Sequence, residues 1–308
     1  MKKIVFFFAL FFGVTMIADT VQYVKLDNGY KVWTKRVGHG PTKILTLHGG
    51  PGCCHDYIEN SFQKVFSPDE FEIVYYDQLG SFLSDQPDDA SLWTVERFCE
   101  EVEQVRKALQ LDDFYLYGHS WGGMLAIEYA LKYQHHLQGM ILSNTPGSIK
   151  SYEVYIRELR SKLPVEVQQQ MIWYEKENDF LNPEYQKLML EKVYSVHLCR
   201  LNPWPDDLML SFQRLNEQPY HTMQGPNEFV ITGNFKDWDH WSDFSSIRVP
   251  TLVISGRHDT INPADTAKIA SLIPNSSFKV CENGSHSSMY DDAENYFNAL
   301  FDFLQKKR

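Results

Sequence analysis

The stretch YGHSWGGMLAIEYA, Tyr117–Ala130, places a serine between glycines. It continues an apolar run, FYLYGHS, that predicts a buried strand, and it leads into GGMLAIEYALKY, which predicts a helix. Ser120 then occupies a strained strand-to-helix turn that passes close to neighbouring backbone, so Gly118 and Gly122 leave the space it needs. Such a turn raises the serine hydroxyl above the sheet and aims the N–H of Trp121, at the start of the helix, at a developing negative charge. The alternative is a glycine-rich turn in which Ser120 only caps the helix.

Strand-like and helix-like segments alternate along most of the chain. Short apolar runs typical of buried strands lie at 43–50, 71–78, 114–120, 139–145, 251–256 and 277–284, and residues 21–37 predict a hairpin that turns at Asn28-Gly29. Apolar residues recur at a spacing of three and four over 94–111, which predicts an amphipathic helix. This alternation predicts an α/β protein whose mostly parallel sheet has helices on both faces.

The strand pattern stops in the middle of the chain. From about Ile149 to His240 the segments are helical, among them 151–163, 164–178 and 183–198, and the strands resume at Thr251. An insertion at the strand ends lies over the place where such sheets bind ligands, so we expect a helical cap. The expected divisions are a signal peptide at 1–18, the first part of the core at 19–148, the cap at 149–240 and the second part of the core at 241–308.

Two late motifs supply partners for the serine. TLVISGRHDTINP places Asp259 just after one strand, and SFKVCENGSHSSMYDD places His286 just after the next. A serine hydroxyl needs a base to take its proton, and the imidazole needs a carboxylate to hold its tautomer. The order serine, acid, histidine is that of α/β-hydrolases, so we predict a triad of Ser120, Asp259 and His286. His119 and His258 are expected to point elsewhere.

The sequence resembles the proline iminopeptidase family of α/β-hydrolases, peptidase family S33. The resemblance covers Val21 to Leu304 and rests on HGGPG at 48–52, YYDQLGS at 75–81, GHSWGG at 118–123, GPNEF at 225–229 and the late Asp and His. It implies an α/β-hydrolase fold with an inserted helical cap and an oxyanion hole made by the N–H groups of Gly50 and Trp121. It also implies that Glu228 binds the free amino group of the substrate; the alternative for Glu228 is a solvated cap carboxylate.

Two departures from the family pattern bear on the substrate. Phe82 stands where many members have a second glycine, and Thr260 stands where some members have a second carboxylate for the ammonium group. One carboxylate attracts an α-amine less strongly than two. The substrate is therefore expected to be an amino acid amide or a short peptide, not strictly a peptide with N-terminal proline.

Composition and the N-terminal residues limit the partners and the cellular location that we expect. The 308 residues carry a formal charge of -11 without a Lys/Arg cluster, which argues against nucleic acid as a partner. Lys2 and Lys3 precede an apolar run from Ile4 to Ala18, which has the length of a signal-peptide core and is short for a membrane span of about 20 residues. We expect export, to the periplasm or outside the cell, and no stable membrane span after processing; an uncleaved anchor is the alternative.

Other side chains leave their roles open. The cysteines are odd in number, so at least one has no partner within the chain, and Cys53 and Cys54 are either reactive, paired with another thiol or inert. The cap aromatics either line an apolar slot for substrate or simply pack the cap; they are Trp173, Tyr174, Trp204, Trp238 and Trp241.

Together these patterns predict an exported serine hydrolase that needs no cofactor and no metal. We expect it to act as an aminopeptidase or amidase on a small peptide or amino acid amide through an acyl-enzyme. A carboxylesterase or lactonase would need the triad but no ammonium site. A binding protein that keeps the fold without turnover is disfavoured by the intact triad.

Overall fold

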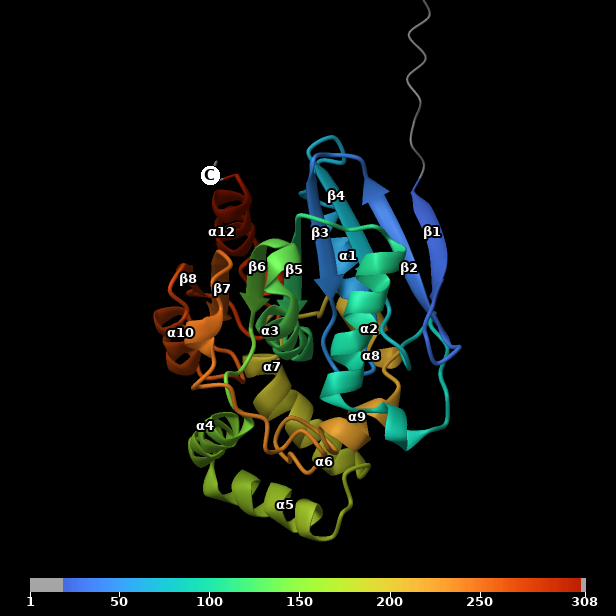
Figure 1. Cartoon of the computed structure of the whole chain (residues 1–308). Coiled ribbons are helices and arrows are strands. Elements are labelled where there is room, and N and C mark those ends of the chain that lie inside the picture. The colour runs from blue at the N-terminus through green and yellow to red at the C-terminus, as the bar shows by residue number, and fades with distance from the viewer. Residues whose placement is uncertain (1–18, 306–308) are drawn as a thin grey trace, which may run out of the picture.

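The computed structural model describes residues 19–305, so the expected signal peptide at 1–18 lies outside it. One sheet carries the strands in the order β1-β2-β4-β3-β5-β6-β7-β8 (Figure 1). Their bounds are β1 Thr20–Lys25, β2 Lys31–Gly38, β3 Thr42–Leu47, β4 Phe71–Tyr76, β5 Phe114–His119, β6 Leu137–Ser143, β7 Thr251–Gly256 and β8 Ser276–Cys281. β2 is antiparallel to β1 and β4, and all later pairs are parallel. The prediction of a mostly parallel sheet is confirmed.

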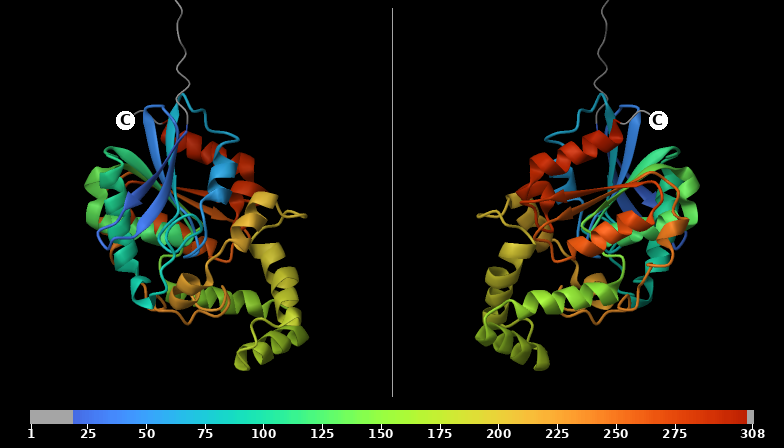
Figure 2. Two further views of the ribbon diagram at one scale, coloured as in Figure 1. Left: turned by 90° about the vertical axis from the view of Figure 1, so that its right-hand side faces the viewer. Right: turned by 90° about the vertical axis from the view of Figure 1, so that its left-hand side faces the viewer.

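The strands form where the sequence is apolar on both faces, because both faces of the sheet are covered. Along β5 the side chain of Leu116 packs into one core, whereas Tyr115 and Tyr117 pack into the other. The first core lies under α2 (Val95–Ala108), α3 (Trp121–Tyr133) and α10 (Pro263–Leu272), and the second under α1 (Asp56–Phe62) and α12 (Ala293–Leu304) (Figure 2). Shorter helical segments complete the core: η1 Ala90–Leu92, η2 Gln134–His136, η4 Phe244–Ser246 and α11 Ser288–Asp291.

Between β6 and β7 the chain forms helices and loops but, within the described residues, no strand. Apart from η4, these helices are α4 Ile149–Ser161, α5 Val165–Lys176, α6 Pro183–Leu188, η3 Met189–Tyr194, α7 Ser195–His197, α8 Asp206–Gln213 and α9 Glu217–Met223. They lie at the end of the sheet towards which the parallel strands point, as Figure 1 shows. This insertion therefore covers the strand ends that carry the candidate site, and we call it the cap.

One stretch of the cap differs from its sequence pattern. The periodicity of 183–198 predicts a single α-helix, but η3 is a π-helical turn within it. A π turn adds a residue to one turn of a helix and is often found at functional sites. None of the helices in residues 19–305 has the length and apolar character needed to cross a membrane.

Candidate active site

Ser120 occupies the predicted turn between β5 and α3. Its backbone has φ 56° and ψ -122°, a conformation that few residues other than glycine adopt. A Cβ at Gly118 would lie 2.2 Å from the carbonyl oxygen of Gly122, and a Cβ at Gly122 would lie 2.1 Å from the carbonyl oxygen of Leu47. Only glycine therefore fits at either position, and the turn holds Ser120 half-buried at the edge of a cavity.

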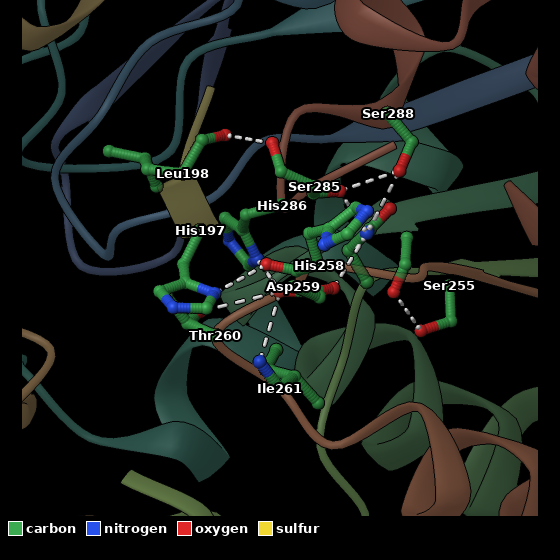
Figure 3. A network of polar contacts seen from close by, with 12 residues as sticks. His197, Leu198, Ser255, His258, Asp259, Thr260, Ile261, Ser285, His286 and Ser288 are labelled. Carbon is green, nitrogen blue, oxygen red and sulfur yellow. Dashed lines mark hydrogen bonds and ion pairs between the residues drawn. The ribbon is translucent and has the colours of Figure 1, made fainter. Parts of the chain in front are cut away.

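Asp259 and His286 meet at the same place (Figure 3). The Nδ1 atom of His286 lies 2.8 Å from Oδ1 of the fully buried Asp259, and the ring lines the cavity that Ser120 also lines. Burial lowers the pKa of His286, but the charge of Asp259 and the hydrogen bond to it raise the pKa more, so the net shift is upward. The structure thus brings all three predicted residues to one site.

The cap holds the loop that carries His286. The backbone N–H of His286 donates to the carbonyl of His197 at 2.9 Å, and the N–H of Ser287 donates to the carbonyl of Leu198 at 2.9 Å. The ring of His197 also bonds the carbonyl of His258 at 2.7 Å (Figure 3). The candidate base is therefore positioned jointly by the core and by the cap.

The two predicted oxyanion donors lie on opposite sides of Ser120 in the sequence and line the same cavity. Trp121 is the first residue of α3, so its N–H has no partner within the helix. Of the HGGPG glycines, Gly49 and Gly50 line the cavity. The N–H of Gly49 already donates to the hydroxyl of Tyr57 at 2.8 Å, which leaves the N–H of Gly50 as the donor.

Gln78, in the YYDQLGS motif, contacts both segments that carry the predicted oxyanion donors. Its Nε2 donates to the carbonyl of His48 at 3.0 Å, and its Oε1 accepts from the indole N–H of Trp121 at 2.8 Å. One amide thus connects the HGGPG loop to the residue after Ser120. This role of Gln78 was not predicted from the sequence, although the YYDQLGS motif contains the residue.

The expectation that His119 points elsewhere is wrong. Its ring lies beside that of His286, with centroids 5.0 Å apart, and both line the cavity. Nε2 contacts the carbonyl of His286 at 2.9 Å, and because a carbonyl only accepts, Nε2 carries the proton and Nδ1 accepts from the hydroxyl of Tyr57 at 2.9 Å. Burial and the nearby His286 lower the pKa of His119 to about 3, so it is neutral and bridges the base to the HGGPG loop.

The cavity has a volume of about 1050 Å³ and is lined by residues of both the core and the cap. It is at the upper end of the range for sites that enclose small molecules, so it leaves room for more than one amino acid. Of the five cap aromatics considered above, Trp204 lines it. Trp173 and Tyr174 border a second hollow, Trp238 donates to a carboxylate of α3, and Trp241 packs against an aromatic ring of η4.

Glu228 lines this cavity together with tyrosines that sequence reasoning did not single out. The hydroxyl of Tyr194, at the end of η3, donates to Oε2 of Glu228 at 2.6 Å, and that of Tyr220, in α9, donates to Oε1 at 2.9 Å. Two such donors fix the carboxylate inside the cavity that also contains Ser120. Nothing in the sequence spacing marks these tyrosines, because they come from separate cap helices.

The loop that carries Glu228 is braced from behind. Asn227 accepts from the N–H of Phe229 at 2.9 Å and donates to the hydroxyl of Tyr185 at 2.9 Å. That hydroxyl donates to Glu175, which forms a two-point ion pair with Arg160, with N–O distances of 2.6 and 2.8 Å. Side chains of α4, α5 and α6 therefore hold the GPNEF loop in place.

The two departures from the family pattern also have structural counterparts. Thr260 is buried and donates to Oδ1 of Asp259 at 3.3 Å. The guanidinium group of Arg214 packs on the ring of Phe82, with its Cζ atom 3.9 Å from the ring centroid. This contact joins the loop after β4 to the cap. All five cysteines are free and buried, and a hydrogen bond with Cys53 together with burial raises the pKa of the Cys54 thiol well above its usual range, which favours the inert alternative for Cys54.

Comparison with known proteins agrees with this architecture. Residues 43–293 match the family model described as the alpha/beta hydrolase fold. The chain is 44% identical to a proline iminopeptidase of Flavobacterium johnsoniae over 89% of this chain and 94% of that protein, and 41% identical to one of Elizabethkingia meningoseptica over 90% and 94%. The crystal structure of the proline iminopeptidase of Mycobacterium smegmatis superimposes with a TM-score of 0.84 at 28% identity, covering 93% of this chain and 98% of that one.

The sheet, the turn at Ser120 and the family match define a hydrolase of the α/β-hydrolase fold. Two relatives above 40% identity match about nine tenths of the chain. The protein belongs to the proline iminopeptidase family of α/β-hydrolases, and it is an enzyme.

Proposed function

We propose that the protein is a serine aminopeptidase that hydrolyses the amide bond after a free N-terminal residue, with a proline iminopeptidase-like activity. The observation that carries the proposal is the Glu228 carboxylate, held by two tyrosine hydroxyls inside the cavity that Ser120 and His286 line. A carboxylate inside a cavity pairs favourably with an ammonium group of a substrate. Hydrolysis of an ester or lactone does not require such a carboxylate. The names of the relatives support the same activity.

The proposed reaction follows from the positions of the side chains. Ser120 Oγ attacks the carbonyl carbon while its proton passes to Nε2 of His286, and Asp259 stabilises the imidazolium through Nδ1. The N–H groups of Gly50 and Trp121 hold the oxyanion. His286 then gives its proton to the leaving amine as the C–N bond breaks, and water releases the acyl group from Ser120 by the same steps.

A substrate panel tests this proposal. Aminoacyl amides, a prolyl amide among them, and p-nitrophenyl esters are assayed side by side with the wild type and Ser120→Ala. We expect the wild type to cleave the amides and Ser120→Ala to lose several orders of magnitude in turnover with the fold intact. A fluorophosphonate probe should label the wild type at Ser120. Labelling that persists at full stoichiometry in Ser120→Ala, or esterase activity without any amidase activity, would contradict the proposal.

We also propose that the protein is exported, to the periplasm or outside the cell. Support comes from the sequence of residues 1–18, where two lysines precede an uncharged apolar run. The mature chain is then expected to begin near Asp19. N-terminal sequencing of the native protein tests this, and recovery from the cytosol with Met1 or Lys2 intact would refute it.

A further inference from the structure

The carboxylate of Asp259 is completely buried, and its two oxygens have different partners. Oδ1 accepts from His286 Nδ1 at 2.8 Å and from the N–H of Ile261 at 3.0 Å (Figure 3). Oδ2 accepts from the side-chain amide of Asn144 at 2.7 Å, which is its one donor among the residues that the structure describes. Because a buried carboxylate oxygen without a donor is costly, this contact restrains the rotation of the acid.

Asn144 is placed for this contact by its backbone. It directly follows β6, is fully buried and has a φ of 51°, a left-handed conformation that asparagine tolerates better than most residues. Its N–H donates to the carbonyl of Ile254 in β7 at 2.9 Å. The residue is thereby fixed at the end of the strand next to the one that leads to Asp259.

The orientation of the amide follows from its partners. Nδ2 also lies 3.0 Å from the carbonyl of Ser285, and both that carbonyl and the ionised carboxylate of Asp259 can only accept. The NH₂ group must therefore face them. The amide oxygen of Asn144 then accepts from the hydroxyl of Ser143 at 2.9 Å.

A chain of buried hydroxyls fixes Ser143 in turn. The hydroxyl of Tyr296, in α12, donates to Ser143 Oγ at 2.8 Å, and it lies 2.6 Å from the hydroxyl of Tyr117, in β5. Since the single proton of Tyr296 is used towards Ser143, Tyr117 is the donor in the second bond. The donors therefore run in one direction, from Tyr117 through Tyr296, Ser143 and Asn144 to Asp259.

We infer that Asn144 is a positioning residue, which holds the carboxylate of Asp259 against His286 and is itself oriented by the hydroxyl chain. The inference rests on the proposed function in taking His286 as the base. It assigns a role in the reaction to α12, whose residues do not line the cavity.

Two variants of Asn144 test the inference. Asn144→Gly removes the amide and accepts the left-handed backbone, whereas Asn144→Asp keeps the shape but turns an oxygen towards Asp259. For Asn144→Gly we expect kcat to fall about tenfold to a hundredfold, the loss typical of a hydrogen bond to a charged group, with KM within about twofold of the wild type. For Asn144→Asp we expect kcat to fall as well, because two carboxyl groups in one buried site share a proton and Asp259 then no longer carries its full charge towards His286.

The other ionisable groups that face His286 are the same in the wild type and in both variants. The carboxylates around it are Asp259, Glu228 and Asp291, and the neighbouring His119 is neutral. None of them is changed in the Asn144 variants. The downfield proton resonance of His286 Nδ1–H, assigned by its loss in His286→Ala, reports the same contact without any substrate and should move or broaden in both variants.

Tyr296→Phe tests the hydroxyl chain, with Tyr129→Phe as its matched control. Tyr129 is an equally buried tyrosine of α3, whose hydroxyl donates to Glu103 at 2.9 Å. Both variants should lose folding stability, but only Tyr296→Phe should lower kcat severalfold and perturb the His286 resonance. Equal kcat values and equal His286 resonances in Tyr296→Phe and Tyr129→Phe would contradict the role of the hydroxyl chain.

Failure of this inference and failure of the proposed function have different signatures. If the wild type is an amidase and Asn144→Gly keeps kcat within twofold with an unchanged resonance, the positioning role is wrong and the proposed function stands. If the wild type hydrolyses no amide, the proposed function fails. A resonance that moves in the Asn144 variants then still supports the positioning of Asp259, and one that does not move overturns it.

Discussion

At the scale of single residues, the chemistry of the site depends on His286, which lines the cavity and pairs with the fully buried carboxylate of Asp259. Burial lowers the pKa of His286, and the charges of Asp259 and, more weakly, Glu228 raise it above its ordinary value. The same carboxylate that is proposed to bind the substrate amine therefore also acts on the base. Binding of an ammonium group at Glu228 would compensate part of that negative charge.

The raised pKa of His286 predicts the pH dependence of the reaction. Because the base must be neutral to take the serine proton, kcat/KM should fall as the pH falls through a pKa above the ordinary value of about 6.5. Removal of the Glu228 charge in Glu228→Gln should move the midpoint to lower pH, since that charge contributes to the shift. A pH profile with p-nitrophenyl acetate measures both, and a wild-type midpoint at or below 6.5 would contradict the electrostatic account.

The sequence identifies residues that lie within motifs and misses those that support them. Ser120 lies in a glycine-flanked turn, and Asp259 and His286 each follow a strand, so local pattern and chain order suffice to find them. Asn144 and Tyr194 touch Asp259 and Glu228 from remote segments, and no local pattern distinguishes them from other buried polar residues. Their roles follow from which strand ends and cap helices meet in space.

At the scale of elements, the cap helices support the GPNEF loop through a polar network. Arg160 and Glu175 join α4 to α5, and Tyr185 and Asn227 extend the connection to the loop. The side chains of the ion pair are each only 14% exposed, so solvent screens the pair less than it would a surface pair.

Arg160→Met tests this network. The change leaves Glu175 without its cationic partner, so the free energy of unfolding should fall by about 1.5 to 3 kcal/mol, as for other hydrogen bonds to charged groups. KM for an unblocked aminoacyl amide should rise, whereas turnover of p-nitrophenyl acetate should not change. Lys162→Met, which removes an exposed ion pair with Glu158 at the end of α4, is the control and should be nearly neutral in denaturant titration and in kinetics. Equal effects of the two substitutions would contradict the role of the network.

Element types were predictable from hydrophobic spacing, but local irregularity was not. The pattern of 183–198 is helical throughout, and it does not distinguish the π turn at Met189–Tyr194 from the α-helical turns beside it. The turn ends at Tyr194, whose hydroxyl reaches Glu228. Periodicity fixes which face of a helix is buried, whereas an added residue within one turn is decided by tertiary contacts.

At the scale of the whole molecule, the cap bonds to both loops that frame Ser120. One connection is the backbone pairing of His197 and Leu198 with the His286 loop. The other is Asn216, whose backbone N–H donates to the carbonyl of Gly52 at 2.9 Å and whose side chain donates to the carbonyl of Gly80 at 2.8 Å. Displacement of the cap would therefore disturb the base and the HGGPG loop together.

Asn216→Ala tests this coupling. Its side chain also caps α9 by accepting from the N–H of Gln218 at 3.0 Å, so its loss should cost about 0.5 to 2 kcal/mol of stability. Because α9 carries Tyr220, kcat/KM for unblocked amides should fall as well. Asn182→Ala removes a helix cap of the same kind at α6 and should affect stability alone. Among the described residues, the side chain of Asn182 bonds Asp179 and Glu184 and neither the triad nor the HGGPG loop. A thermal melt and steady-state kinetics on both variants decide the matter; unchanged kinetics in Asn216→Ala would contradict the coupling.

Glu228 is proposed to select a free N-terminus, and the ratio of kcat/KM for an unblocked prolyl amide to that for its N-acetylated form measures this selection. Acetylation removes the charge that pairs with Glu228, and loss of one partner of a desolvated charge pair costs about 2 to 5 kcal/mol, roughly 30-fold to several-thousand-fold. Thr260, in place of a second carboxylate, favours the lower end. Glu228→Gln should remove most of the preference while sparing p-nitrophenyl acetate. Equal rates for the blocked and unblocked amides in the wild type would make Glu228 a structural cap residue and favour an esterase instead.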